Sequence, residues 1–257
     1  MTDLGTSSRP GPALRFGAAT GFLTRIRMPD AALATDLRLA AGFFPAVGLL
    51  IGALGASVYF LCQLILPIPV AVTMSVIATV LVTGAFHEDG LADATDGLGG
   101  GYTPESVLRI MQDSRIGSFG AIALILALIL KIQTLSAMGN PWIVPALLVG
   151  HSISRLASTA LVRVNVYVRT DGKSKPLADR ISWPSLALAS IFGLGPLLLL
   201  PWALALTVAV AVAATTAFLA WRQRRRVGGF TGDLLGMTQQ ITELVAYVAI
   251  CAWVWQG

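Results

Sequence analysis

Seven apolar segments, separated by polar or proline-containing connections, account for most of the chain. Residues 43–66, 68–86, 117–137, 141–162, 185–200, 202–221 and 239–256 form these segments. A membrane-spanning helix needs about 20 mainly apolar residues. The fifth segment is short and is interrupted by Pro196 and Pro201, so the fifth and sixth form either a tight hairpin or one broken pair. The pattern predicts an all-α, polytopic membrane bundle of about seven transmembrane helices.

The composition supports a membrane protein and a single structural unit. Hydrophobic residues make up 55% of the chain and charged residues 12%, with a mean hydropathy of +0.76, whereas soluble domains carry about 25% charged residues. We expect residues 1–13 to be a disordered tail and residues 14–257 to be one transmembrane catalytic domain. Residues 14–30 are more weakly apolar, and they form either an amphipathic helix on the membrane surface or a short helix packed against the bundle.

Charge alternates between connections along the chain. Lys and Arg are concentrated in the N-terminal segment and in residues 87–116, 163–184 and 222–238, while the short connections carry no charge. The positive-inside rule therefore places the N-terminus and every long polar loop on the cytoplasmic side. The net charge of +5 fits loops that face anionic lipid in a bilayer better than it fits nucleic-acid binding.

The polar segment 87–116 begins with a cluster of acids. Glu88, Asp89, Asp93 and Asp96 lie within nine residues of a chain that has only 13 Asp and Glu. Such carboxylates repel one another unless a cation is present. If the segment is helical, the three aspartates share one face, and Glu88 reaches it from the helix start. Oxygen ligands favour Mg²⁺, or Mn²⁺, over zinc; the alternative is a solvated acidic loop.

Three further groups of residues are suited to binding phosphate. Arg115 can hold a phosphate bidentately, Asp113 and Asp96 are candidate general bases, and an arginine inside an apolar segment, such as Arg155, needs a partner or a polar cavity. Glu243 and Lys131 are further charges within predicted spans. The simpler alternatives are a capped helix start, an arginine that extends to the membrane surface, and a plain glycine-rich loop. The other candidate phosphate or substrate contacts are Gly99, Gly100, Ser114, His151, Thr231, Gly232 and Asp233.

These motifs, in this order and with this hydropathy, resemble the cobalamin-5′-phosphate synthases, also called adenosylcobinamide-GDP ribazoletransferases. The matching stretches are Phe22–Arg25, Phe44–Gly48 with Ile51 and Gly52, His87–Gly100, Met111–Gly117, Ser154 with Arg155, and Gly228–Asp233.

The resemblance implies transfer of the adenosylcobinamide phosphate group from adenosylcobinamide-GDP to α-ribazole or its 5′-phosphate. GMP is released and magnesium is required. It further implies a multi-pass protein of the bacterial inner membrane with its active site on the cytoplasmic side; a homo-oligomer is left open. A CDP-alcohol phosphatidyltransferase-like enzyme is an alternative, since Asp93-Ala-Thr-Asp-Gly97 fits the opening of that family's signature. A cation or solute transporter is a second alternative.

Overall fold

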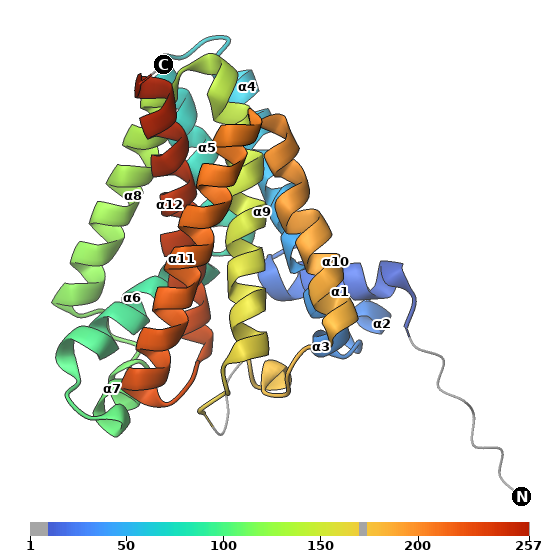
Figure 1. The fold of residues 1–257 in the computed structure, drawn as a ribbon, viewed down its shortest axis with the longest axis vertical. Coiled ribbons are helices and arrows are strands. Elements are labelled where there is room, and N and C mark those ends of the chain that lie inside the picture. Colours follow the sequence, from blue (N-terminus) through green and yellow to red (C-terminus); the bar gives the residue numbers. More distant parts are fainter. Residues whose placement is uncertain (1–9, 170–173, 257) are drawn as a thin grey trace, which may run out of the picture.

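The protein is a bundle of helices, as a computed structural model of the chain shows for residues 10–169 and 174–256 (Figure 1). Within these residues there is no β-strand beyond one isolated bridge, so the all-α prediction is confirmed. Each predicted apolar segment contains a helix. These helices are α4 (Phe44–Cys62), α5 (Ile68–Thr83), α8 (Ser118–Met138), α9 (Asn140–Val164), α10 (Trp183–Leu194), α11 (Trp202–Val227) and α12 (Gly232–Gln256).

Fewer helices than seven meet a strict test of length and apolarity for crossing a membrane. Among the described residues four do so, namely Leu37–Cys62, α8, α11 and α12, and the count rises to five if the bent pair α5 and α6 (Phe86–Gly100) is one span. Helix α9 is 25 residues long but contains Pro145, His151 and Arg155. The number of seven spans and the side of the N-terminus therefore stay predictions.

Helix α9 packs directly against α4, α12, α10 and α11. Two glycines of α4 make the closest of these approaches possible. A Cβ at Gly48 would collide with the carbonyl group of His151, and a Cβ at Gly52 would lie 2.7 Å from the carbonyl oxygen of Leu147. The α4–α9 crossing therefore holds the polar residues of α9 in a fixed place inside the bundle.

A sharp bend after α5 produces the helix that carries the acidic cluster. Gly84 (φ 66°) and Ala85 (φ 57°) both adopt the left-handed conformation, which ends one helix and redirects the chain. Helix α6 (Phe86–Gly100) then runs at 86° to α5 and crosses the lower part of the bundle in Figure 1. The helical interpretation of the acidic stretch is confirmed, and the polar segment 87–116 contains α6 and the short α7 (Pro104–Ile110). The predicted span 68–86 ends at Thr83.

The N-terminal region folds against the bundle. It consists of α1 (Pro12–Leu23), α2 (Asp30–Leu33), α3 (Leu37–Ala40) and the 3₁₀ turn η1 (Ala41–Phe43). Helix α1 buries residues 17–20 and Leu23 against α2, α3 and α4, as the packed-helix alternative predicted. Most of the expected tail lies outside the described residues, but Pro12 and Ala13 already belong to α1.

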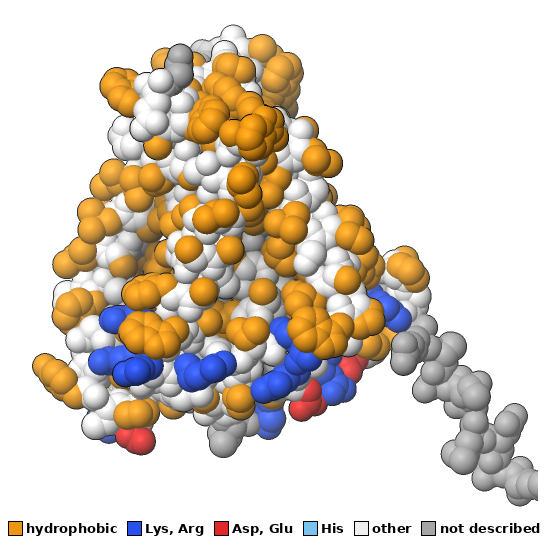
Figure 2. Space-filling view, viewed as in Figure 1, with side chains coloured by type: hydrophobic (Ala, Val, Ile, Leu, Met, Phe, Trp, Pro, Cys, Tyr) orange, Lys and Arg blue, Asp and Glu red, His pale blue; other side chains and the backbone are white. Residues whose placement is uncertain are grey.

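Charged side chains gather at one end of the molecule. Figure 2 shows the Lys and Arg side chains of the visible face in its lower third, below a broad apolar surface. In Figure 1 the same end holds α6, α7, the C-terminal ends of α9 and α11, and the 3₁₀ turn η2 (Lys175–Leu177). We call this end the polar face. The prediction that the long polar connections share one face is confirmed for the described residues.

The fifth and sixth apolar segments form the hairpin that the sequence left open. Helix α10 is extended by the 3₁₀ turn η3 (Gly195–Leu199), which contains Pro196, and α11 starts at Trp202 directly after Pro201. The two helices run in opposite directions and both pack against α9, which lies between them in Figure 1.

Candidate active site

A cavity of ≈ 200 Å³ opens on the polar face between α6, α12 and the segment that follows α9. Asp89 of α6 and Asp233 of α12 supply its carboxylates, and Arg169 supplies a guanidinium. We call it the acidic cavity. Its lining residues are Phe86, Asp89, Gly90, Tyr167, Arg169, Ser174, Gly232 and Asp233.

The close approach of α6 and α12 sets the distance between these carboxylates. A Cβ added to Gly90 would lie 3.1 Å from the carbonyl oxygen of Asp233 and 3.2 Å from the Cα of Gly236. Only glycine lets two helices cross so closely without displacement. The glycines therefore bring Asp233 beside Asp89, which is 144 positions earlier in the chain.

A short backbone pairing brings in the arginine. The N–H of Val168 donates to the carbonyl of Phe230 (3.1 Å), and the N–H of Phe230 donates to the carbonyl of Val166 (2.8 Å). Gly229 is required between them, because a Cβ there would collide with the Val166 carbonyl oxygen. The pairing places Arg169 within reach of Asp233, and their side chains form an ion pair of 2.8 Å.

Among the described residues that line this cavity, two carboxylates face one guanidinium. The pKa of Asp93 is raised to about 7, mainly by burial and further by the nearby carboxylates of Asp89 and Asp233, while Arg169 acts in the opposite direction. A carboxyl with such a pKa needs a cation or a proton near neutral pH. No three His, Cys, Asp or Glu side chains of the described residues are arranged to hold a metal ion by themselves. Any cation at this site must take part of its ligands from elsewhere.

Asp96, the third aspartate of the predicted metal set, faces a different element. Its two carboxylate oxygens accept hydrogen bonds from the backbone N–H groups of Gly117 (2.7 Å) and Gly120 (2.8 Å). These are orphan donors at the start of α8, so Asp96 caps α8 and fastens it to α6. Of the two other aspartates, Asp89 lines the acidic cavity, and Asp93 lies one turn further along α6, close enough for Asp89 and Asp233 to raise its pKa.

The predicted phosphate-binding residues before α8 are exposed. Arg115 forms an ion pair of 2.7 Å with Asp113, and hydrogen bonds from Arg115 lower the pKa of Asp113 to about 2. Ser114 lies between them, and Gly99 and Gly100 are exposed at the end of α6. All five lie near the polar face but do not line the acidic cavity, and their roles stay predictions.

Two predicted residues stand at the start of α12. The hydroxyl of Thr231 is buried and accepts a hydrogen bond from the N–H of Leu234 (3.2 Å), so it caps the helix. Gly232 lines both the acidic cavity and a smaller inner cavity of ≈ 40 Å³. Arg155 reaches this inner cavity from α9; its guanidinium is buried, and its Nε has no hydrogen-bond partner among the described residues.

His151 belongs to a separate cluster of charges inside the bundle. The carboxylate of Glu243 pairs with the ammonium of Lys131 (2.8 Å) and with Nδ1 of His151 (3.1 Å). It also accepts a hydrogen bond of 2.6 Å from the amide of Gln239. Gln240 completes the cluster by accepting from Lys131 (3.0 Å). We call these five residues the buried ion network.

Glu88 faces this network. Its Oε1 accepts a hydrogen bond of 3.0 Å from the amide of Gln240. Glu88 therefore turns away from the aspartates that follow it in sequence. Glu88 does not line the acidic cavity, so its role as a metal ligand stays a prediction.

Sequence reasoning missed the role of Arg169, Tyr167 and Ser174 in the acidic cavity. Arg169 was visible only as one of several basic residues in the connection 163–184. The available signal was Gly228-Gly-Phe230, because consecutive glycines permit a close backbone approach. The sequence does not indicate which segment packs against these glycines.

Several apolar helices and a carboxylate-lined cavity at the charged end define a helical membrane protein with a candidate cation and phosphate site. The family model of the cobalamin-5-phosphate synthases matches residues 15–251. The chain belongs to this family, and with it to the transferases of cobalamin biosynthesis.

Individual relatives agree with this assignment. The chain is 47% identical to an adenosylcobinamide-GDP ribazoletransferase of Ralstonia pickettii over 240 residues, which cover 91% of the chain and 94% of the relative. It is 43% identical to a protein of the same name from Shewanella frigidimarina over 244 residues, with 92% and 94% covered. No solved structure matches the chain.

Proposed function

We propose that the protein transfers the adenosylcobinamide phosphate group from adenosylcobinamide-GDP to α-ribazole or α-ribazole 5′-phosphate. A ribazole hydroxyl oxygen forms the new bond to the phosphorus on the cobinamide side of the diphosphate. The bond from that phosphorus to the oxygen of the GMP part breaks, and GMP leaves with the electron pair. Membership of the family over residues 15–251 carries this proposal, and the acidic cavity offers a place for it.

The donors of the acidic cavity suit Mg²⁺. Carboxylate oxygens are the hard ligands that this ion prefers, and it commonly takes only one or two protein carboxylates together with substrate phosphates. Asp89 and Asp233 would supply them. When bound, the ion would neutralise charge on the diphosphate and on the leaving GMP. The raised pKa of Asp93 supports a site in which positive charge is still missing.

The third carboxylate is then available for the proton of the attacking hydroxyl. Asp93 suits this role because a base works best with a pKa near the working pH, and its pKa is about 7. The bases proposed from the sequence suit it less: Asp96 is engaged by two backbone N–H groups, and the pKa of Asp113 is about 2. We therefore place the proton on Asp93.

Two arginines flank the carboxylates. Arg169 lies at the mouth of the site in an ion pair with Asp233, and it can exchange this partner for a substrate phosphate once a cation occupies the carboxylates. Arg155 lines the inner cavity, and its Nε has no hydrogen-bond partner among the described residues; this cavity shares Phe86, Ser174 and Gly232 with the acidic cavity. We assign both guanidiniums to the transferring phosphate.

The site would face the cytoplasm in a bacterial inner membrane. The basic residues at the polar face support this orientation through the positive-inside rule, and a nucleotide substrate is available on that side.

One experiment tests the reaction and its metal. The purified full chain is incubated with adenosylcobinamide-GDP and α-ribazole, with Mg²⁺ or with EDTA, and cobalamin and GMP are measured by mass spectrometry. We expect both products only with Mg²⁺. Equal product with EDTA would contradict the metal assignment. Absence of product together with transfer from a CDP-alcohol would favour the CDP-alcohol phosphatidyltransferase alternative.

A further inference from the structure

An apolar groove lies on the outside of the bundle, away from the acidic cavity. It has a volume of ≈ 390 Å³, which falls in the range of about 300–1,000 Å³ found for ligand pockets. Its walls come from α9, α10 and α11, and small side chains form much of its surface. The lining residues are Ile153, Leu156, Ala157, Ala160, Val164, Leu194, Ala209, Val212, Ala213, Thr216, Ala217 and Ala220.

The length and position of the groove match one leaflet of a bilayer. It extends from Ile153 to Val164 on α9 and from Ala209 to Ala220 on α11. Eleven helical steps of 1.5 Å make about 16 Å, and half of a hydrocarbon core of about 30 Å is 15 Å. Val164 is the last residue of α9, so the groove runs from the polar face toward the middle of the predicted membrane.

The end of the groove at the polar face carries positive charge. The Nη2 of Arg224 donates to the carbonyl of Val164 (2.7 Å) and to Oδ1 of Asn165 (3.0 Å), so its guanidinium sits over the groove end. Arg163 is adjacent to Val164, and its Nε is buried without a hydrogen-bond partner among the described residues. The residues lining the groove include no acid to neutralise these arginines.

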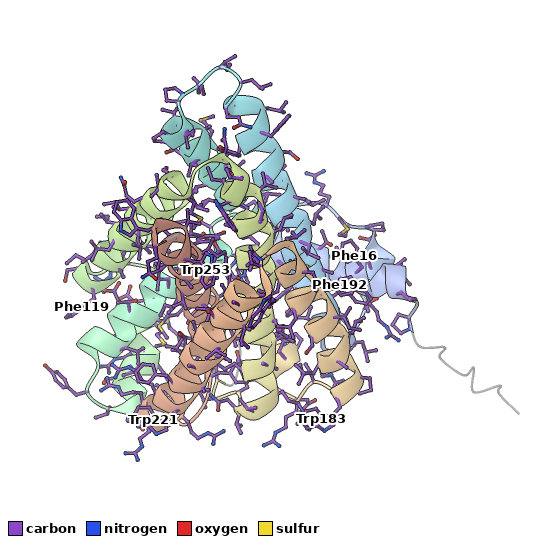
Figure 3. All side chains as sticks on the ribbon, turned by 45° about the horizontal axis from the view of Figure 1, so that its top comes forward. Phe16, Phe119, Trp183, Phe192, Trp221 and Trp253 are labelled. Atoms are coloured by element: carbon purple, nitrogen blue, oxygen red, sulfur yellow. The ribbon has the colours of Figure 1, made fainter. Side chains whose placement is uncertain are left out.

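Aromatic residues lie at the same end of the bundle as these arginines. The guanidinium of Arg163 lies 4.4 Å from the ring of Trp183, and that of Arg225 lies 5.3 Å from the ring of Trp221. Both tryptophans are at the same end of the bundle in Figure 3, one from α10 and one from α11. Tryptophans gather at the membrane–water boundary, so the arginines stand at the depth of lipid headgroups.

We propose that this groove binds one anionic phospholipid. An acyl chain lies against the alanines, and the headgroup phosphate lies between Arg163 and Arg224. The apolar wall alone would accept the acyl chain of any lipid. The two arginines, which lie at the level of Trp183, make the site selective for a headgroup with a net negative charge. The site is independent of the transfer reaction.

Native mass spectrometry of the detergent-purified full chain tests the site. The probes are phosphatidylglycerol and phosphatidylcholine with identical acyl chains. We expect one phosphatidylglycerol per chain, retained at concentrations roughly tenfold lower than phosphatidylcholine. Equal retention of the two lipids by the wild-type protein would overturn the proposal.

Paired variants separate the chain contact from the headgroup contact. Ala217 is exposed and lines the groove, while Ala214 is exposed on the same helix but does not line it. Ala217→Leu should reduce retention of both lipids, and Ala214→Leu should leave it unchanged. Arg163→Gln combined with Arg224→Gln should remove the preference for phosphatidylglycerol, with Arg222→Gln as the matched control. If the double variant does not fold, the single Arg163→Gln decides.

The outcome also excludes another occupant. If Ala217→Leu converts a dimer to a monomer and leaves lipid retention unchanged, the groove is an interface between two copies, and the lipid site is wrong. Equal retention of phosphatidylglycerol by Ala217→Leu and Ala214→Leu would also show that the lipid site is wrong.

Discussion

Helix α12 carries one acid of each of two charge clusters, Asp233 at its start and Glu243 ten residues further on. Glu243 is completely buried, yet the ammonium of Lys131 balances its charge, and Nδ1 of His151 and the Gln239 amide contact the same carboxylate. Asp233 pairs with Arg169 and shares its surroundings with Asp89 and Asp93. The buried network pairs its acid with a cation of the protein, whereas the described lining of the acidic cavity holds two carboxylates and one guanidinium.

This difference separates a structural role from a functional one. A buried acid with matched cations gains nothing from a ligand, and its removal leaves other charges without partners. A carboxylate cluster at the polar face, with one pKa raised to about 7, stays unfavourable until a ligand brings positive charge. Substitutions in the first cluster should therefore act on stability, and substitutions in the second on catalysis.

The largest effect is expected for Asp93→Asn. Loss of the proton acceptor should reduce the transfer rate by about 10²–10⁴-fold. The melting temperature should not fall, because the raised pKa of Asp93 means that its ionised form disfavours the folded state. Product formation and thermal unfolding of the same preparation measure both, with the exposed Asp30→Asn as control. A variant that keeps full activity would contradict the assignment.

Glu243→Gln should show the reverse pattern. It leaves Lys131 buried without an acid, which costs about 3–5 kcal/mol of stability in comparable buried pairs. Thermal unfolding in detergent measures the loss. The double variant Glu243→Gln with Lys131→Met should recover part of it, because both charges are then absent. If Glu243→Gln unfolds at the wild-type temperature, the network is not a source of stability.

Arg169→Gln should have an intermediate effect on substrate binding. Loss of a charged contact to phosphate should raise KM about tenfold, with a smaller change in kcat. Arg169→Lys should restore part of the binding, since the charge is kept. Steady-state kinetics with varied adenosylcobinamide-GDP separate the two constants, and an unchanged KM in Arg169→Gln would remove this arginine from the site.

The pH dependence follows from Asp93. Its pKa is raised to about 7, and the active form is the deprotonated one. kcat/KM should therefore fall roughly tenfold for each pH unit below the pKa of Asp93, and this pKa should lie below 7 in the Mg²⁺-bound enzyme because the cation offsets the charge of Asp89 and Asp233. The residual activity of Asp93→Asn should not show this fall of kcat/KM at low pH. A wild-type profile that stays flat down to pH 5 would show that the reaction does not depend on this carboxyl.

The smallest effect is expected for Glu88→Gln. An amide oxygen can still accept the hydrogen bond from Gln240, and Glu88 faces the buried network. The transfer rate should stay within about threefold of wild type, and the melting temperature should be nearly unchanged. A loss as large as that of Asp93→Asn would return Glu88 to the predicted metal ligands.

The sequence was sufficient for the helical membrane class, the seven apolar segments and the family. These properties depend on local composition and on motifs that are contiguous in the chain. It also located the acidic stretch correctly. It left the backbone there open between a helix and a solvated loop, because a Gly-rich acidic sequence is also typical of a loop; packing against α12 and α8 makes α6 a helix.

The division of the aspartates required the tertiary structure. Helical spacing groups Asp89, Asp93 and Asp96 equally, but only contacts across the bundle show that Asp96 caps α8. The partners Arg169 and Asp233 lie 80 and 144 positions after Asp89 in the chain. A glycine permits a close approach, but it does not indicate which segment approaches, because a close contact depends on both surfaces. The sequence thus determined which residues carry the charge, and packing decided which charges are matched and which wait for a ligand.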